Sequence, residues 1–160
     1  MIIVLMGVTG SGKTTVGKLL ACELGWRYFD ADDFHPPANV ARMRSGVALD
    51  DADRQPWLER LRGLIRDSLE SEENAVLACS ALKETYRRRF LINKRVKLVF
   101  LKGDFQLIQK RLSKRRGHYM NPALLESQFA TLEQPNDSLE IDISADAAEI
   151  VKTIRRRLGV

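Results

Sequence analysis

The segment Gly7 to Thr14 combines glycines, a lysine and a threonine at the spacing of a phosphate-binding loop. It satisfies the pattern G-x-x-x-x-G-K-[S/T], directly after an apolar run and directly before a helical pattern. Glycines let successive backbone N–H groups point at phosphates, and the following helix adds its positive N-terminal end. Lys13 would bridge the β- and γ-phosphate oxygens of ATP, and the Thr14 hydroxyl would be a direct Mg²⁺ ligand.

A glycine turn without a ligand is the alternative interpretation of this segment. It is the weaker one, because the loop, strand and helix patterns agree with one another. The expected cofactors are therefore ATP and Mg²⁺. Residues expected to bind the nucleotide here are Gly7, Val8, Thr9, Gly10, Ser11, Gly12, Lys13, Thr14 and Thr15.

Three carboxylates follow the second predicted strand, in the sequence Asp30-Ala31-Asp32-Asp33. Parallel strands end at one edge of a sheet, so we expect the cluster to face the γ-phosphate from a neighbouring strand. Asp30 would orient Mg²⁺ through its waters, and Asp32 or Asp33 would accept or position the proton of an attacking hydroxyl. The alternative is that these aspartates are turn and cap residues before the helix near Pro37; it is less favoured for the trio than for any one residue.

The strand and helix patterns predict an α/β fold. Apolar runs indicate buried strands at residues 2–6, 27–30, 75–79 and 97–101, and the alternation at 139–143 indicates a fifth strand near an edge. Helical stripes separate them, one of which begins behind Asp104 as a cap. We expect a three-layer α/β/α P-loop kinase fold with a five-stranded parallel sheet and a mobile lid. Residues 36–54 and 114–122 resist the pattern, and we interpret them as a substrate-binding segment and the lid.

Length and composition favour a single domain over residues 1–160. The chain is 44% hydrophobic, and independent domains most often have roughly 100–150 residues. The apolar stretch from Met1 to Met6 is too short to span a bilayer and lacks a basic leader, so we expect a cytoplasmic protein with no membrane partner. Cys22 and Cys79 are interpreted as reduced, buried, structural thiols.

The net charge of +5 is unevenly distributed along the chain. Residues 1–80 carry 9 basic and 12 acidic side chains, whereas residues 81–160 carry 17 and 9. A basic half permits a nucleic-acid-binding or regulatory P-loop module, but no basic stripe with interleaved aromatic residues or groove-reading motif supports it. We therefore expect no nucleic-acid partner.

Five segments together resemble the small P-loop gluconokinase family. They read MGVTGSGKTTVG, FDADDFHPPANVARM, SGVALDDADRQPWL, VLACSALKETYR and RLSKRRGHYMNPALLESQFATLE, and they span most of residues 6–133. The resemblance implies a nucleoside-monophosphate-kinase-like fold, a homodimer, and transfer of the ATP γ-phosphate to the 6-hydroxyl of D-gluconate. Another small-molecule P-loop kinase, of the shikimate kinase type, is the rival interpretation.

The same resemblance implies a substrate pocket. A polyhydroxy acid needs cationic donors for its carboxylate and paired acceptors for its hydroxyls. The alternative role for Arg54 is to pair only within its own helical turn. The alternative role for His35 and His118 is capping or packing. Most members of the run from Arg87 to Arg89 are expected to face water. The implied substrate residues are Asp32, Asp33, His35, Arg54, Ser80, Lys83, Arg87, His118 and Gln128.

Two arginines near the expected lid resemble the lid arginines of nucleoside monophosphate kinases. Arg111 and Arg115 are four residues apart, so one helix would place them on one face. Arg115 would fold over the transferring phosphoryl group as a catalytic residue, and Arg111 would lie nearer the adenine. The alternative is a solvated basic face.

Overall fold

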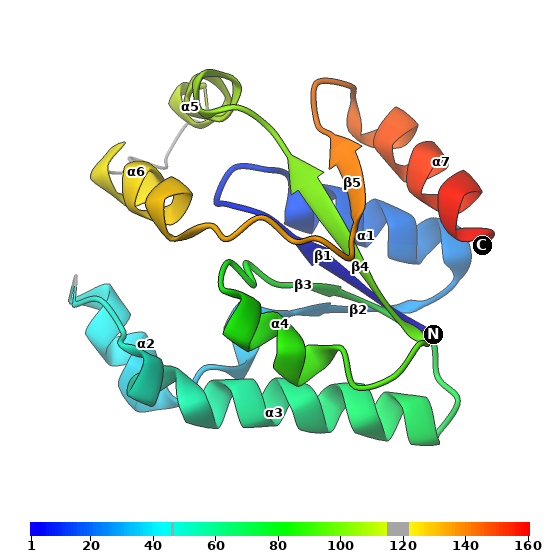
Figure 1. Ribbon diagram of the computed structural model, residues 1–160, viewed down its shortest axis with the longest axis horizontal. Helices are drawn as coiled ribbons and strands as arrows, with labels where there is room; N and C mark the ends of the chain where they lie inside the picture. The colour runs from blue at the N-terminus through cyan, green and yellow to red at the C-terminus, as the bar shows by residue number, and fades with distance from the viewer. Residues whose placement is uncertain (46, 115–121) are drawn as a thin grey trace.

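A parallel sheet of five strands forms the centre of the computed structural model, which describes residues 1–45, 47–114 and 122–160 (Figure 1). The strand order is β2-β3-β1-β4-β5, and every neighbouring pair is parallel. The predicted parallel sheet and the edge position of the last strand are confirmed. The strands are β1 (Ile2–Met6), β2 (Arg27–Asp30), β3 (Ala75–Ala78), β4 (Val96–Lys102) and β5 (Leu139–Asp142).

Burial on both faces explains why the inner strands read as continuous apolar runs. All five residues of β1 are buried, and successive side chains point to opposite faces of the sheet. Ile2, Val4 and Met6 join one core cluster, whereas Ile3 and Leu5 join the other. The sheet is therefore a middle layer between two apolar cores.

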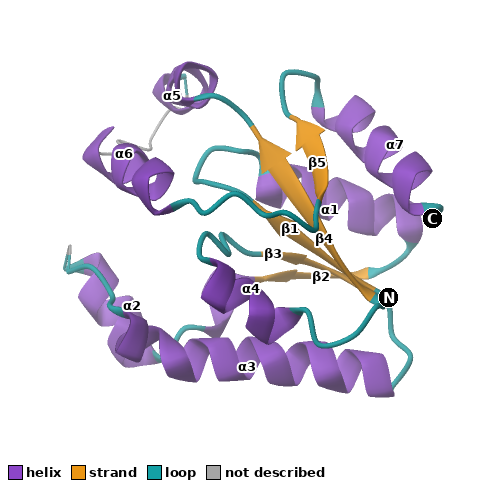
Figure 2. Cartoon of the chain, in the orientation of Figure 1, coloured by secondary structure: helices purple, strands orange, loops and turns teal. Residues whose placement is uncertain are grey.

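Helices cover both faces of the sheet (Figure 2). On one face lie α1 (Lys13–Leu24), α5 (Phe105–Ser113) and α7 (Ala147–Leu158), which contribute Leu20, Ile108 and Ile150 to the core. The opposite face is covered by α3 (Asp51–Glu70) and α4 (Glu84–Phe90). The predicted three-layer arrangement is confirmed.

Shorter elements stand beyond the carboxyl ends of the strands, where ligands of open α/β sheets bind. The turn after β2 is a 3₁₀ helix, η1 (Ala31–Phe34), and α2 (Pro37–Arg44) follows it. Residues 36–54 are therefore partly helical, although their sequence broke the helical pattern. On the other side of the sheet's edge, α6 (Pro122–Thr131) stands opposite α2 in Figure 1.

Side-chain caps mark the starts of α3, α5 and α7. The Asp104 carboxylate accepts a hydrogen bond from the Leu107 N–H at 2.7 Å, which confirms the predicted cap. At the start of α3, the side chains of Asp50 and Asp53 accept reciprocal hydrogen bonds from each other's backbone N–H groups, at 2.7 Å and 3.0 Å. Such caps satisfy N–H groups that have no partner inside the helix.

Two sequence-based expectations are corrected by the fold. β2 is not a neighbour of β1, because β3 lies between them. Cys22 is exposed on α1, while Cys79 is buried as expected, and burial raises the pKa of the Cys79 thiol to about 12. Within the described parts of the chain, no helix is long and apolar enough to cross a membrane.

The core between α3 and the sheet gives a stability prediction. Leu61 is fully buried there, so Leu61→Ala should lower the free energy of unfolding by about 2–5 kcal/mol, through lost burial and the cavity left behind. The exposed neighbour Arg62 on the same helix is the matched control, and Arg62→Ala should change it by less than about 0.5 kcal/mol. Denaturant titration measures both; equal losses would contradict this assignment of the core.

Candidate active site

The phosphate loop joins β1 to α1 and turns sharply at Gly7. This residue has φ +148°, and a β-carbon there would lie 2.8 Å from Ser11 Oγ and 2.9 Å from the Leu101 carbonyl oxygen. Only glycine fits this position without displacing the loop. Within the described residues, no side chain caps the N-terminus of α1, and its first turn contains no acidic residue. The amides and the positive end of the helix are thus available to an anion such as a phosphate.

Lys13 lies folded back over the loop. Its ammonium group donates hydrogen bonds to the carbonyl oxygens of Gly7 at 3.0 Å and Val8 at 2.9 Å. The backbone N–H of Thr9 donates to Gln128 Oε1 on α6 at 2.6 Å. Gln128, expected in the substrate pocket, therefore contacts the phosphate loop directly, a contact that its sequence position did not suggest.

The hydroxyl of Thr14 and the carboxylate of Asp30 face each other at the end of the sheet. Thr14 Oγ1 lies 3.5 Å from Asp30 Oδ2, which also accepts a hydrogen bond from the Tyr28 hydroxyl at 3.1 Å. The other oxygen, Oδ1, accepts from the Asp32 N–H at 3.1 Å and caps η1. Asp30 is thus a cap, as the alternative interpretation held, yet its second oxygen faces the phosphate loop. An oxygen-only pair of this kind suits a hard divalent cation, directly or through water.

Asp32 and Asp33 lie on the turn that begins at Asp30. Both are exposed, but the protein surrounding the Asp32 carboxyl group limits its hydration, and this desolvation raises its pKa, with the charge of Asp30 adding to the effect. A carboxylate whose pKa is raised is a better proton acceptor than a carboxylate with an ordinary pKa.

His35 is packed against the same turn. Its ring stacks on Trp57 with centroids 4.6 Å apart, and burial lowers its pKa. Trp57 donates to the Ala31 carbonyl oxygen at 2.7 Å, so the indole also fixes η1. The buried Nδ1 of His35 has no hydrogen-bond partner among the described residues. The packing role considered for His35 is therefore real, and it leaves one polar ring atom unsatisfied.

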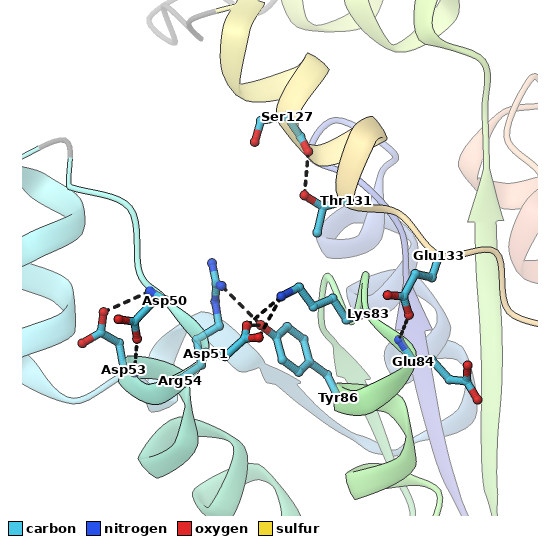
Figure 3. A network of polar contacts seen from close by, with 10 residues as sticks. All are labelled: Asp50, Asp51, Asp53, Arg54, Lys83, Glu84, Tyr86, Ser127, Thr131 and Glu133. Atoms are coloured by element: carbon cyan, nitrogen blue, oxygen red, sulfur yellow. Dashed lines mark hydrogen bonds and ion pairs between the residues drawn. The ribbon is translucent and has the colours of Figure 1, made fainter.

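The start of α3 meets the start of α4 in a polar network (Figure 3). The Lys83 ammonium group contacts both carboxylate oxygens of Asp51, at 2.8 Å and 2.9 Å, and the Tyr86 hydroxyl donates to the same carboxylate. Arg54 donates to the Tyr86 hydroxyl at 3.3 Å. Hydrogen bonds from Lys83 and Tyr86 hold the pKa of Asp51 below its usual range. The network joins Arg54 and Lys83, which were predicted, to Asp51 and Tyr86, which were not.

The loop that carries Ser80 and Lys83 is stabilised by a buried arginine. Ala81 has φ +45°, a left-handed conformation that costs a residue with a side chain about 1–3 kcal/mol. Arg87 is only 4% exposed and donates to the carbonyl oxygens of Ala81 and Leu82, at 3.0 Å and 2.8 Å. Arg87 is thus the member of its run that does not face water, and the contacts seen are with the loop. The Ser80 carbonyl oxygen accepts from the Gly7 N–H at 3.3 Å, which ties this loop to the phosphate loop.

A cavity of about 260 Å³ opens on the other side of the phosphate loop. It brings together Thr15 and Arg111, two residues expected at the nucleotide, with Asp146 at the N-terminus of α7. Arg111 donates to the Ile143 carbonyl oxygen, which fixes the guanidinium at the cavity wall. The predicted Arg115 and His118, and residues 115–121 of the expected lid, lie outside the described residues.

Comparisons with known proteins agree with this geometry. The model of the shikimate kinase family matches residues 9–156. A probable gluconokinase of Dictyostelium discoideum is 44% identical over 168 residues, covering 96% of this chain and 84% of that protein. The thermosensitive gluconokinase of Escherichia coli (strain K12) is 40% identical over 160 residues, again covering 96% and 84%. The crystal structure of a gluconokinase from Sinorhizobium meliloti 1021 matches with a TM-score of 0.87 at 37% identity, over 98% of this chain and 90% of that one.

The five-stranded parallel sheet and the phosphate loop define a nucleotide-using kinase of the P-loop class. Within that class, and within the wider family that the shikimate kinase model describes, the chain belongs to the gluconokinase family.

The raised pKa of Asp32 gives a prediction on stability. Because the folded protein binds the proton more tightly than the unfolded chain, stability should fall as pH rises from the ordinary aspartate pKa through the raised one. Asp32→Asn removes the charged form, so the variant should be more stable than the parent at neutral pH and equal to it well below both pKa values. Denaturant titrations across this range test the sign; a variant that is less stable at neutral pH would contradict it.

Proposed function

We propose that this kinase transfers the γ-phosphate of ATP to the 6-hydroxyl of D-gluconate, giving 6-phospho-D-gluconate and ADP. The observation that carries the proposal is the meeting of two segments at one edge of the sheet, with Thr14 of the phosphate loop 3.5 Å from Asp30 of the acidic turn. The acceptor is proposed from relatives that are similar over 96% of this chain and are named a probable gluconokinase and a thermosensitive gluconokinase.

The nucleotide end of the site is proposed to use Mg²⁺. Thr14 would coordinate the ion and Asp30 would orient it through water, because their oxygens face one another beside the α1 N-terminus. When bound, the ion supplies charge neutralisation of the β- and γ-phosphate oxygens. Lys13 would exchange its contacts with the loop carbonyls for phosphate oxygens, and Arg111 would border the base in the cavity behind the loop.

The acidic turn is proposed to act on the acceptor hydroxyl. Asp32 follows Asp30 by two residues, and its backbone N–H is anchored to that carboxylate. Its raised pKa suits a group that takes up a proton while the hydroxyl attacks, and Asp33 is the other candidate.

The acceptor pocket is proposed to lie between α3 and α4. Arg54 and Lys83 would bind the gluconate carboxylate, and Lys83 would share or exchange its contact with Asp51 on doing so. His35 and Ser80 would contact the sugar hydroxyls. Direct substrate contacts of Arg87, His118 and Gln128, and closure of Arg115 over the transferring group, remain parts of the proposal.

We also propose that the 160 residues form one domain, with residues 36–54 on the substrate side and 114–122 as the lid. A homodimer in the cytoplasm, with no nucleic-acid or membrane partner, completes the proposal. The family resemblance supports the homodimer.

A coupled assay of ADP release should show acceptor-dependent turnover with gluconate. Because a site built to hydrogen-bond its substrate rejects mismatched hydroxyl patterns, the specificity constant kcat/KM for gluconate should exceed that for shikimate by at least about 100-fold. Lys13→Ala is the control for contaminating kinases and should lower kcat with gluconate at least about 100-fold. Turnover with shikimate and none with gluconate would overturn the proposed acceptor.

Asp32→Asn should lower kcat by about 10²–10⁴-fold, the usual contribution of a positioned general base. The dissociation constant for the ATP analogue AMP-PNP with Mg²⁺ should stay within about threefold of the parent's, since Asp30 and Thr14 are unchanged. Asp33→Asn is the matched comparison on the same turn and should lower kcat less than Asp32→Asn does. The opposite ranking of the two variants would assign the base to Asp33.

A further inference from the structure

Tyr28 is a residue of the site that no sequence motif singled out. It lies on β2, two residues before Asp30, and its side chain is half-buried beneath α1. Its hydroxyl donates to Asp30 Oδ2 at 3.1 Å, the same oxygen that faces the Thr14 hydroxyl. The phenol therefore contacts the carboxylate at the point where the β2 edge meets the phosphate loop.

The position of the Tyr28 ring depends on Gly17. A β-carbon at this buried glycine of α1 would lie 2.7 Å from Tyr28 Cε2 and 3.3 Å from both Tyr28 Cδ2 and Leu5 Cδ1. Real β-carbons do not approach other atoms as closely as 2.7 Å, so any larger residue would displace the ring. Glycine inside a helix costs roughly 0.5–1 kcal/mol relative to alanine, and here it permits the close approach. Gly17 also lies three residues after Thr14, on the same side of the helix.

Both oxygens of Asp30 are held by these contacts. The Asp32 N–H binds Oδ1 at 3.1 Å, and the Tyr28 hydroxyl binds Oδ2 at the same distance. An aspartate carboxylate otherwise rotates over a broad range about its last torsion. The two donors restrict this rotation and hold the carboxylate in one orientation.

We propose that Tyr28 is a positioning residue for the metal-nucleotide site, because its hydroxyl holds the Asp30 carboxylate toward Thr14 in the orientation that a phosphate-bound cation needs. The inference rests on the proposed roles of Asp30 and Thr14. It adds the residue that orients them, and the glycine that makes room for that residue. Groups that orient metal ligands typically contribute 10–100-fold to metal affinity.

The test is calorimetric titration of AMP-PNP into the protein, with saturating Mg²⁺ and separately with EDTA. The ratio of the two dissociation constants isolates the contribution of the metal. Tyr28→Phe keeps the ring against Gly17 and removes only the hydroxyl. It should leave the affinity in EDTA within about twofold of the parent's and lower the Mg²⁺ enhancement about 10-fold. The Mg²⁺ concentration for half-maximal activity should rise by the same factor, with the KM for gluconate unchanged.

Two further variants separate positioning from general damage. Gly17→Ala pushes the ring away while the hydroxyl remains in the chain, so it should lower the Mg²⁺ enhancement as Tyr28→Phe does. Lys18→Met removes the exposed cation that lies 5.8 Å from the centroid of the same ring and should leave the enhancement unchanged.

The outcomes also separate this inference from the proposed function. If Tyr28→Phe keeps the parent's Mg²⁺ enhancement while Asp30→Asn loses it, the positioning role of Tyr28 is overturned and the role of Asp30 stands. If Tyr28→Phe weakens AMP-PNP equally with and without Mg²⁺, the role of Tyr28 is structural and the inference is overturned. If Asp30→Asn itself keeps the enhancement, the proposed metal role of Asp30 fails, and the inference fails with it.

Discussion

The contact between the Thr14 hydroxyl and the Asp30 carboxylate is the constraint on which the rest of the site depends. The two residues are 16 positions apart, and β3 separates β1, which leads into the phosphate loop, from β2, which ends at Asp30. They meet because α1, after leaving β1, packs back across β3 and onto β2. The positive N-terminus of α1 therefore lies near the carboxyl end of β2, although β2 is not a neighbour of β1 in the sheet. One crossover places an anion-binding loop beside a cluster of carboxylates, so a phosphate bound there would be electrostatically costly unless a cation or a proton compensates the negative charges.

The acceptor side of the site shows the complementary arrangement. There Lys83 pairs with the carboxylate of Asp51, and Arg54 donates to the Tyr86 hydroxyl, which itself donates to Asp51. In the loop that carries Ser80 and Lys83, Ala81 has a left-handed conformation. The buried Arg87 stabilises this loop by donating to the carbonyl oxygens of Ala81 and Leu82. Glu133, just after α6, adds a further support by accepting from the Glu84 N–H at 2.5 Å. The loop that carries the proposed substrate residues Ser80 and Lys83 thus has its backbone fixed by Arg87 and Glu133, and a fixed backbone is what keeps reacting groups oriented in an enzyme.

The sequence predicted the elements well and their lateral order poorly. The bounds of β1 and of the edge strand β2 were predicted correctly, and those of β3 and β4 to within one residue. For the inner strands the reason is that burial on both faces imposes continuous apolar runs. The insertion of β3 between β1 and β2 was not predictable, since strand order depends on long-range packing and leaves no local pattern. The resemblance singled out Arg87 as a substrate residue, but its burial could not be predicted from the run of three arginines, because consecutive side chains point in different directions and only the packing of α4 selects the buried one. Asp51 and Tyr86 were missed because their contacts are made with residues on another element. Tyr28 was missed because no motif marks the contact of its hydroxyl with Asp30, two residues further along the same strand.

The most direct test of the account is a crystal structure of the protein with AMP-PNP, Mg²⁺ and D-gluconate. In this complex we expect the phosphates on the amides around Lys13, the ion between Thr14 and Asp30, and the gluconate 6-hydroxyl within about 3 Å of the Asp32 carboxylate, facing the γ-phosphate. A complex in which the aspartates point away from the triphosphate, and other residues hold the hydroxyl nearest the γ-phosphate, would contradict it.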